Sequence, residues 1–490
     1  MKPVMVLLAA AAGVVVVAGA AQASAATIKV TTTKDQFGSQ PKKCSLREAI
    51  QAANTNARFG GCAKGKGADR IVLKRGVYRL TRTGSDDDNA SGDLDINGPV
   101  TIAGKGEKRT VIDGNGERIK ESVFHVITGR ARFAGMTIRN GFDDDNQYGG
   151  AIDHVSPGAL TLVRMRFVHN AADYLAGAVY HYNLASNVTI ERSKFIENDS
   201  AYYGGGFYSD GAKNVKIRNS LFKDNSADYA YGGGIGVNGA VGKTVIARTR
   251  LLGNVTDYDY GGGLYLDSDE GAALSKLTVV GNTSGAYSSG YGGGIYTYDT
   301  DVTLRDSTIA GNVSSYYGGG IYAQAGSLKL INSTVSRNHA SNDSGYGGGI
   351  YADGPVDIRS STIVYNRAYV GAGIYEDDPV TYKNSIIARN RELYAVQTQD
   401  CYSGSPGSSL GHNFFGDDTC DASGPGDIAS GTYSEPANPL VEALGNNGGP
   451  TPTHALLRGS PAIDKGKGCP KRDQRGHKRK GKCDIGAFER

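Results

Sequence analysis

Tyr317-Gly-Gly-Gly-Ile321 is one copy of a glycine triplet, flanked by a tyrosine and an apolar residue, that recurs through the middle of this chain. The third position of the triplet serves as a marker that returns about every 28 residues, at Ala151, Ala178, Gly206, Gly234, Gly263, Gly294, Gly320, Gly349 and Gly373. Asparagine recurs with the same period after short β-branched runs, at Asn140, Asn170, Asn198, Asn225, Asn254, Asn282, Asn312, Asn338, Asn366 and Asn390. Two markers in phase indicate a repeat protein.

Within each repeat, short runs such as Val215-Lys-Ile217 and Leu328-Lys-Leu330 alternate apolar and polar residues. This period is typical of strands and not of helices. Short strands joined without helices, at one turn per ~28 residues, predict an all-β fold: a parallel β-helix solenoid of roughly 12 coils. A β-propeller is the alternative, but its blades need about 40 to 50 residues.

Composition narrows the class of protein further. The 490 residues include 71 Gly but only 14 Pro, which excludes a collagen triple helix. With 39% hydrophobic residues and a net charge of +4, the chain can bury a core and has no general attraction for polyanions, so nucleic acid is not expected as a partner.

The chain is expected to divide into four parts. Residues 1–25 are predicted to be a signal peptide, because a lysine precedes an apolar run and small residues suit cleavage. Residues 26–69 are predicted to cap the first coil, 70–400 to form the β-helix, and 401–490 to form a C-terminal region. No stretch after the signal peptide approaches the ~18 to 20 apolar residues of a membrane span, so a secreted or cell-surface protein is predicted.

The predicted cap contains a helix-start signature. Ser45-Leu-Arg-Glu48 is a capping box, and an apolar stripe at helical spacing follows it. A short helix is therefore expected to seal the first coil. Exposed sheet ends are an aggregation hazard, which solenoids cover with such caps.

Six cysteines fall into three local couples. Six cysteines permit 15 connectivities. Cysteines of an exported protein are expected to be oxidised to disulfides. The short loops within each couple favour pairing of nearest neighbours. We therefore predict the disulfides Cys44–Cys62, Cys401–Cys420 and Cys469–Cys483. No close Cys-x-x-Cys pair suggests a zinc site, and no metal site is predicted from the cysteines.

The two ends of the chain carry motifs of a known family. Cys44-Ser-Leu-Arg-Glu-Ala-Ile-Gln-Ala-Ala-Asn54 resembles the opening motif of bacterial CSLREA-domain proteins. Residues 438–489, through Asn447-Gly-Gly-Pro-Thr-Pro-Thr-His454 and Asp484-Ile-Gly-Ala-Phe-Glu489, resemble the terminal region of choice-of-anchor Q proteins. With the repeats, this resemblance covers nearly all of the chain after the signal peptide. It implies a right-handed parallel β-helix of the pectin-lyase-like type, exported to the cell surface or medium, and it brings no catalytic residues.

Two sets of tyrosines flank the triplets and are candidate ligand-binding residues. One set lies three positions before the marker, at Tyr148, Tyr203, Tyr231, Tyr260, Tyr291, Tyr317 and Tyr346. The other lies two positions after it, at Tyr180, Tyr208, Tyr265, Tyr296, Tyr322, Tyr351 and Tyr375. Strand alternation turns the second set outward, which predicts a glycine floor with an aromatic row on each side. Two interpretations stay open: rings that strengthen the coils by stacking, or a shallow groove for an extended sugar chain.

The repeating asparagines are expected to form an internal ladder at a tight bend, with amides bonded from coil to coil. Candidate acid–base residues are few. His154 and His181 lie at marker plus three, one coil apart, with Asp153 beside them, and such a group can transfer protons. Later coils carry apolar residues at that position, which favours an interior pair whose polar atoms are satisfied. At marker plus four, Asp353 and Asp377 are the first carboxylates in adjacent coils.

Charged segments offer two further candidates. The loops Asp86-Asp-Asp-Asn89 and Asp143-Asp-Asp-Asn146 can supply carboxylates to Ca²⁺, but neither matches a known calcium loop, so solvated loops and no cofactor are expected. The basic run over residues 471–482 reads as a solvated face or as a contact for anionic cell-wall polymer or surface sugars.

These observations predict an exported, monomeric, non-catalytic β-helix that binds an extended surface partner, a polysaccharide or other glycan, as an adhesin does. The alternatives are a polysaccharide lyase or glycoside hydrolase and a structural surface spacer without a ligand. A hydrolase needs two facing carboxyl groups about 5 to 9.5 Å apart. Fold alone does not separate these three functions.

Overall fold

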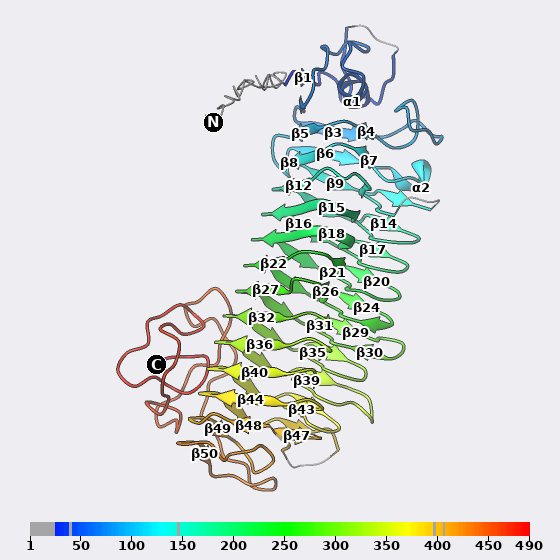
Figure 1. Cartoon of the computed structure of the whole chain (residues 1–490). Coiled ribbons are helices and arrows are strands. Elements are labelled where there is room, and N and C mark those ends of the chain that lie inside the picture. The colour runs from blue at the N-terminus through cyan, green and yellow to red at the C-terminus, as the bar shows by residue number, and fades with distance from the viewer. Residues whose placement is uncertain (1–24, 39–41, 145–147, 395–397, 405–406) are drawn as a thin grey trace, which may run out of the picture.

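The chain winds into a right-handed parallel β-helix of about twelve coils, as predicted (Figure 1). This computed structural model describes residues 25–38, 42–144, 148–394, 398–404 and 407–490. The predicted signal peptide therefore lies outside the described residues except for its last position. Within the described part of the chain, no helix is long and apolar enough to span a membrane.

Three sheets run along the rod. A 24-stranded sheet extends from β1 (Thr27–Lys29) to β48 (Ser408–Ser409), a 14-stranded sheet from β3 (Gly76–Arg79) to β50 (Ile428–Ala429), and a 10-stranded sheet from β10 (Phe142–Asp143) to β46 (Arg391–Glu392). One coil contributes β35 (Ile321–Gln324), β36 (Leu328–Ile331), β37 (Thr334–Ser336) and β38 (His339–Ala340). Each strand pairs in parallel with its equivalent one coil away, so side chains stack in columns along the rod.

The core lies inside the coils and follows the alternation in the sequence. Leu328 and Leu330 are buried, whereas Lys329 between them faces outward and pairs with Asp357 of the next coil at 3.3 Å. Inside the rod, the rings of Phe167, Phe195 and Phe222 stack with centroids 4.7 and 4.4 Å apart. Continuous apolar columns of this kind are what hold successive coils together.

The glycine triplets are required by backbone conformation and by close packing. The first glycine is left-handed, for example at Gly318 with φ of 62°, a conformation that costs glycine nothing. At the third, a Cβ on Gly320 would lie 2.5 Å from the carbonyl oxygen of Gly349 and 2.9 Å from Nδ2 of Asn338. The triplet therefore lets an asparagine of the same coil pack directly against the backbone.

The predicted asparagine ladder is present from Asn170 to Asn390, and its members are fully buried. In each step the backbone N–H and the side-chain amide both donate to the side-chain oxygen of the next asparagine, as Asn312 does to Asn338 at 3.0 and 2.9 Å. Asn140 was predicted to belong to the ladder, and this was wrong. It is exposed and left-handed, and the ladder position of its coil is Gly141, which donates to Asn170.

The N-terminal cap has the predicted helix and disulfide. Helix α1 (Leu46–Asn54) starts at Ser45, whose hydroxyl accepts from the Glu48 N–H while the Glu48 carboxylate accepts from the Ser45 N–H. Cysteines pair as 44 with 62, 401 with 420, and 469 with 483, as the spacing predicted. One further short helix among the described residues, α2 (Gly116–Ile119), lies in a loop of an early coil.

The C-terminal region folds back along the side of the rod, beside β32 (Val302–Arg305), β36, β40 (Val356–Arg359) and β44 (Val380–Lys383) (Figure 1). Its buried Gln474 bonds to the hydroxyls of Thr334 and Thr308 in the 14-stranded sheet at 2.7 and 2.9 Å. The region therefore docks laterally against late coils and does not simply extend the rod.

Candidate functional site

The tyrosines two positions after the marker point away from the core, yet they are buried. Tyr180, Tyr208, Tyr265, Tyr296, Tyr322 and Tyr351 have almost no exposed surface, and Tyr375 is half-buried. Rings of neighbouring coils lie close together, as in the pair Tyr265 and Tyr296 with centroids 5.5 Å apart. Burial raises the pKa of these phenols far above its usual range, so the hydroxyls stay protonated.

The other predicted row covers this buried row. Tyr231 packs on Tyr265 with centroids 4.4 Å apart, and Tyr317 packs on Tyr351 at 4.8 Å. The members Tyr148, Tyr203, Tyr231, Tyr260, Tyr291, Tyr317 and Tyr346 are all half-buried. The predicted open glycine floor between two rows was therefore wrong, because the rings of the two rows interlock over it.

A third set of tyrosines, which was not predicted from the sequence, forms the exposed surface of this face. We call Tyr174, Tyr202, Tyr229 and Tyr258 the outer tyrosine stripe. Three of its rings are 49%, 48% and 38% exposed, those of Tyr174, Tyr229 and Tyr258. Successive centroids lie 4.9, 4.7 and 5.3 Å apart. The signal was present in the sequence, since these tyrosines follow the same period of about 28 residues.

Carboxylates border the outer tyrosine stripe. Asp228 and Asp257 directly precede two of its tyrosines, and partial burial raises the pKa of both. Asp199 lies near enough to add repulsion to each of them. The surface therefore combines ring edges, phenolic hydroxyls and hydrogen-bond-accepting carboxylates, a mixture that suits a polyol.

The carboxylates Asp353 and Asp377 are joined to the buried tyrosine row. The Tyr322 hydroxyl donates to Asp353 at 2.9 Å, and the Tyr351 hydroxyl donates to Asp377 at 3.1 Å. Burial, with repulsion from Asp377, raises the pKa of Asp353. Each carboxylate thus fixes a tyrosine of the preceding coil.

His154 and His181 stack inside the rod with ring centroids 5.2 Å apart, and both are fully buried, as predicted. Nδ1 of His181 bonds to the Ser209 hydroxyl at 3.0 Å, but neither ring nitrogen of His154 has a hydrogen-bond partner among the described residues, so the pair is only partly satisfied. Burial lowers their pKa to about 4 and about 3, so both are neutral near pH 7. Asp153 does not join them. Its side chain lies on the outer face of the strand, so the three residues do not form one acid–base site.

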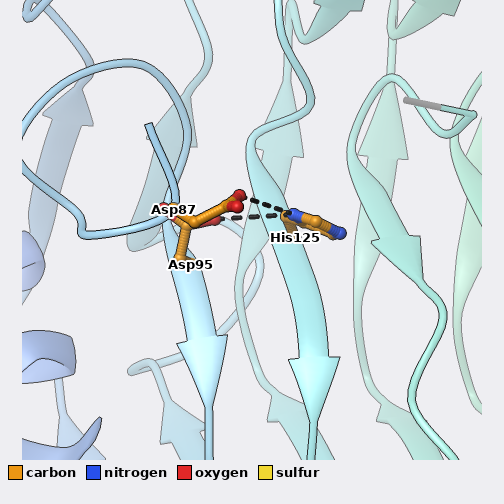
Figure 2. A group of neighbouring side chains, drawn as sticks. All are labelled: Asp87, Asp95 and His125. Atoms are coloured by element: carbon orange, nitrogen blue, oxygen red, sulfur yellow. Dashed lines mark ion pairs between the residues drawn. The ribbon is translucent and has the colours of Figure 1, made fainter. Parts of the chain in front are cut away.

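Asp153 instead belongs to a polar column that continues the buried tyrosine row toward the N-terminus. Asp95 on β4 (Asp95–Asn97), His125 on β7 (Phe124–Thr128) and Asp153 on β11 (Ile152–His154) are register partners in consecutive coils, followed by Tyr180. The loop residue Asp87 reaches over this column, and Figure 2 shows both carboxylates pointing at His125. Nδ1 of His125 lies 3.5 Å from Asp95 and 4.0 Å from Asp87.

The electrostatics of this column are unusual for a surface. Burial alone would lower the pKa of His125, but Asp95, Asp153 and Asp87 together raise it. Burial raises the pKa of Asp153 to about 6, with His125 opposing the shift. Within the part of the chain that the structure describes, Asp87, Asp95 and His125 are the one group of three side chains placed to ligate a metal ion. Sequence reasoning missed Asp95 and His125, although the marker register extends back to them.

Hydrogen bonds or ion pairs hold some side chains of the two acidic loops and of the basic run. Asp86 accepts from two backbone N–H groups of its own loop at 2.9 Å, and Asp144 pairs with Lys120 at 2.7 Å. The last two positions of the second loop, 145 and 146, lie outside the described residues. In the basic run, Arg479 is buried against Glu489, so the run is not entirely the solvated face that its composition predicted.

Comparison with known proteins adds two similarities. The Chlamydia polymorphic membrane protein repeat matches residues 306–324, which include one asparagine of the ladder and one glycine triplet. No curated protein matches the chain. Among solved structures, the crystal structure of pectate lyase Pel9A is similar over 95% of this chain and 97% of that chain, at 14% sequence identity and a TM-score of 0.35. Neither similarity assigns the chain to a family.

Proposed function

We propose that this chain is an exported, monomeric, non-catalytic β-helix that binds an extended glycan along the outer tyrosine stripe, as an adhesin does. The observation that carries this proposal is the stripe itself. Its exposed rings lie in consecutive coils and repeat at the coil spacing, which presents equivalent contacts to successive units of a linear polymer. A structural ladder alone would not require rings beyond the two rows already packed beneath.

The stripe favours an uncharged polysaccharide. Rings that stack along the rod cover one another's faces, so they offer edges and hydroxyls to a ligand. Asp228 and Asp257 add acceptors for sugar hydroxyls and would repel an anionic chain. An anionic cell-wall polymer would instead contact the exposed cations of the C-terminal region, such as Lys471, Arg472 and Lys478.

Export is supported by three disulfides, which persist in oxidising compartments. The motifs at residues 44–54 and 438–489 resemble CSLREA-domain and choice-of-anchor Q proteins, which accords with the same location. The absence of a free cysteine among the described residues agrees with an oxidised chain.

The proposal is tested by titrating the protein with a panel of soluble neutral polysaccharides in affinity electrophoresis and calorimetry. Changing Tyr202, Tyr229 and Tyr258 together to Ala is expected to weaken binding at least tenfold, because each ring contributes about 0.5 to 1.5 kcal/mol. The matched control changes Tyr182 and Tyr298, two exposed tyrosines on strands of the 24-stranded sheet, and is expected to bind normally.

Unchanged binding in the folded triple variant would contradict the stripe as the site. No binding of the native protein to any glycan of the panel would favour a structural spacer. Release of unsaturated or reducing ends during long incubation, lost on changing Asp353 or Asp377, would identify a lyase or hydrolase instead.

A further inference from the structure

We propose that Asp87, Asp95 and His125 form a binding site for a divalent transition-metal ion of the Zn²⁺ type, with Asp153 as a supporting carboxylate behind the histidine. The site lies on the outer face of the first coils, at the N-terminal end of the buried tyrosine row. It is independent of the glycan proposal, because none of its residues belongs to the outer tyrosine stripe.

The donor set fits such an ion. One imidazole nitrogen and two carboxylate oxygens suit Zn²⁺, whereas Ca²⁺ prefers oxygen ligands alone. Ligand bonds of about 2.0 to 2.2 Å in a tetrahedral site place ligand atoms roughly 3.3 to 3.6 Å apart. Nδ1 of His125 already lies 3.5 Å from Asp95 and 4.0 Å from Asp87. All three ligand atoms lie within 4.8 Å of one another, and the exposed Asp87 side chain is free to move closer.

Buried polar atoms without hydrogen bonds point to a ligand here. Oδ1 of Asp95, Nδ1 of His125 and Oδ1 of Asp153 are buried and make no hydrogen bond. The Asp95 side chain has no exposed surface, and Asp153 is almost as deeply buried. The Asp95 oxygen has only the long 3.5 Å contact with His125. A buried carboxylate oxygen without a full hydrogen bond is costly, and a bound cation would offset this cost.

The loop that carries Asp87 is fixed in place by its neighbour Asn89. The fully buried Asn89 side chain donates to the Asp95 carbonyl at 2.6 Å and accepts from the Asp95 N–H at 3.0 Å. This exchange docks the loop on β4, so Asp87 is held over the column before any ion binds. Preorganised ligands of this kind lose little entropy on binding.

Asp153 fits the role of a carboxylate that orients the ligating histidine. In Figure 2 the second nitrogen of His125 points away from Asp87 and Asp95. Asp153 is the register partner of His125 in the next coil, on the side opposite Asp95. A carboxylate behind a metal-bound histidine fixes the ring and raises its basicity. Solvent reaches the site through Asp87, which is 82% exposed, so water can complete the coordination.

The test is calorimetric titration of chelator-treated, untagged full-length protein with ZnCl₂ at pH 7.5. One ion per chain is expected to bind, with micromolar or tighter affinity. The variants Asp87→Asn and His125→Gln are each expected to weaken binding at least tenfold. Asp153→Asn is expected to weaken it severalfold, and the matched control His169→Ala, an exposed histidine paired with Glu197, is expected to bind normally.

Asp87→Asn keeps the test decisive if a buried variant fails to fold, because Asp87 is a loop residue with an exposed side chain. Co²⁺ binding provides a second readout, since its visible spectrum reports histidine ligation. The proposal is overturned if the native protein binds Zn²⁺ no tighter than about 100 µM, or if His169→Ala and His125→Gln weaken binding equally. Tighter binding of Ca²⁺ that His125→Gln leaves unchanged would replace it with an oxygen-only site in the acidic loop.

Discussion

Ile321, the residue after a glycine triplet, is fully buried inside the rod. Ile321→Asp is expected to destabilise the protein by about 3 to 5 kcal/mol, because an unpaired charge there has neither water nor a partner. Lys329→Ala, which removes an outward-facing partner of Asp357, is expected to cost less than about 1 kcal/mol. Urea unfolding of both variants checks this, and equal losses would mean that the inward phase of the strands is assigned wrongly.

Glu376 is a buried acid, and burial raises its pKa to about 8. The folded chain thus holds this proton more tightly than the unfolded chain, so the stability that it contributes is lost as pH rises from about 4.5 through 8. Glu376→Gln is expected to be more stable than the native chain by roughly 2 to 4 kcal/mol at pH 8.5 and equal to it near pH 4.5.

Melting curves of this variant and of Glu270→Gln, an exposed control, between pH 4.5 and 8.5 provide the measurement. Parallel pH profiles for the native chain and Glu376→Gln would show that Glu376 is ionised in the folded state.

At the scale of single residues, the sequence correctly predicted which strand residues point inward and that the histidine pair is buried. It did not predict that Tyr265 and Tyr296 would be buried outside the core. Strand alternation determines the face on which a ring lies, but not what covers that face. Here the cover comes from tyrosines on a bend, whose direction no alternation rule gives.

The asparagine ladder is the element that distinguishes this rod from a simple stack of strands. Asn338→Ala removes the acceptor of two Asn312 amide groups and leaves the buried N–H groups without partners. A loss of about 3 kcal/mol or more is expected, with the fastest local amide exchange at Asn312. Asn187→Ala breaks an exposed amide pair of the same length, with Asn214, and is the matched control.

Hydrogen exchange and melting temperature measure the stability of Asn338→Ala and of the control Asn187→Ala. Similar small effects in the two would mean that the ladder adds little beyond strand pairing.

A second ladder, made of serine hydroxyls, was not predicted from the sequence. The backbone N–H groups of Ser307, Ser333 and Ser361 each donate to the serine hydroxyl of the next coil at 3.2 Å. Serine is common in loops of any fold, so its period is weaker evidence than that of asparagine after a β-branched run. The capping helix, by contrast, was predicted correctly from the sequence, because a capping box and an apolar stripe coincide there.

At the scale of the whole molecule, Gln474 is one of the contacts by which the C-terminal region docks on the rod, beside the His454–Ser336 hydrogen bond of 2.9 Å and an apolar cluster. The Gln474 side chain contacts Thr308, Thr334 and Thr451. Gln474→Ala is expected to leave the Thr334 hydroxyl without its acceptor and to speed proteolysis of residues 438–490 at least fivefold, while the melting of the rod changes little. Lys478→Ala, an exposed change in the same region, is the control.

Mass spectrometry of timed digests measures the effect. Cleavage at native rates in Gln474→Ala would show that the region is held by other contacts.

The sequence predicted the rod, its approximate number of coils and the three disulfides, because each depends on period or on local spacing. The docking face could not be predicted. Threonines such as Thr308 and Thr334 occur in strands throughout the rod, and nothing in their sequence context distinguishes the ones that Gln474 selects.

The asparagine ladder ends at Asp400, which accepts both amide groups of Asn390 at 3.0 and 2.8 Å. Burial, together with repulsion from Asp417, raises the pKa of Asp400. A carboxyl group has no NH₂ group, so only the backbone half of the step continues, from the Asp400 N–H to the Asp417 carboxylate at 3.0 Å. The asparagine ladder therefore runs in one direction along the rod and ends at Asp400. The repeat geometry therefore allows whole coils to be added or removed between Asn170 and Asn282, before the coils that the C-terminal region contacts, so the length of the rod can vary while both of its ends stay the same.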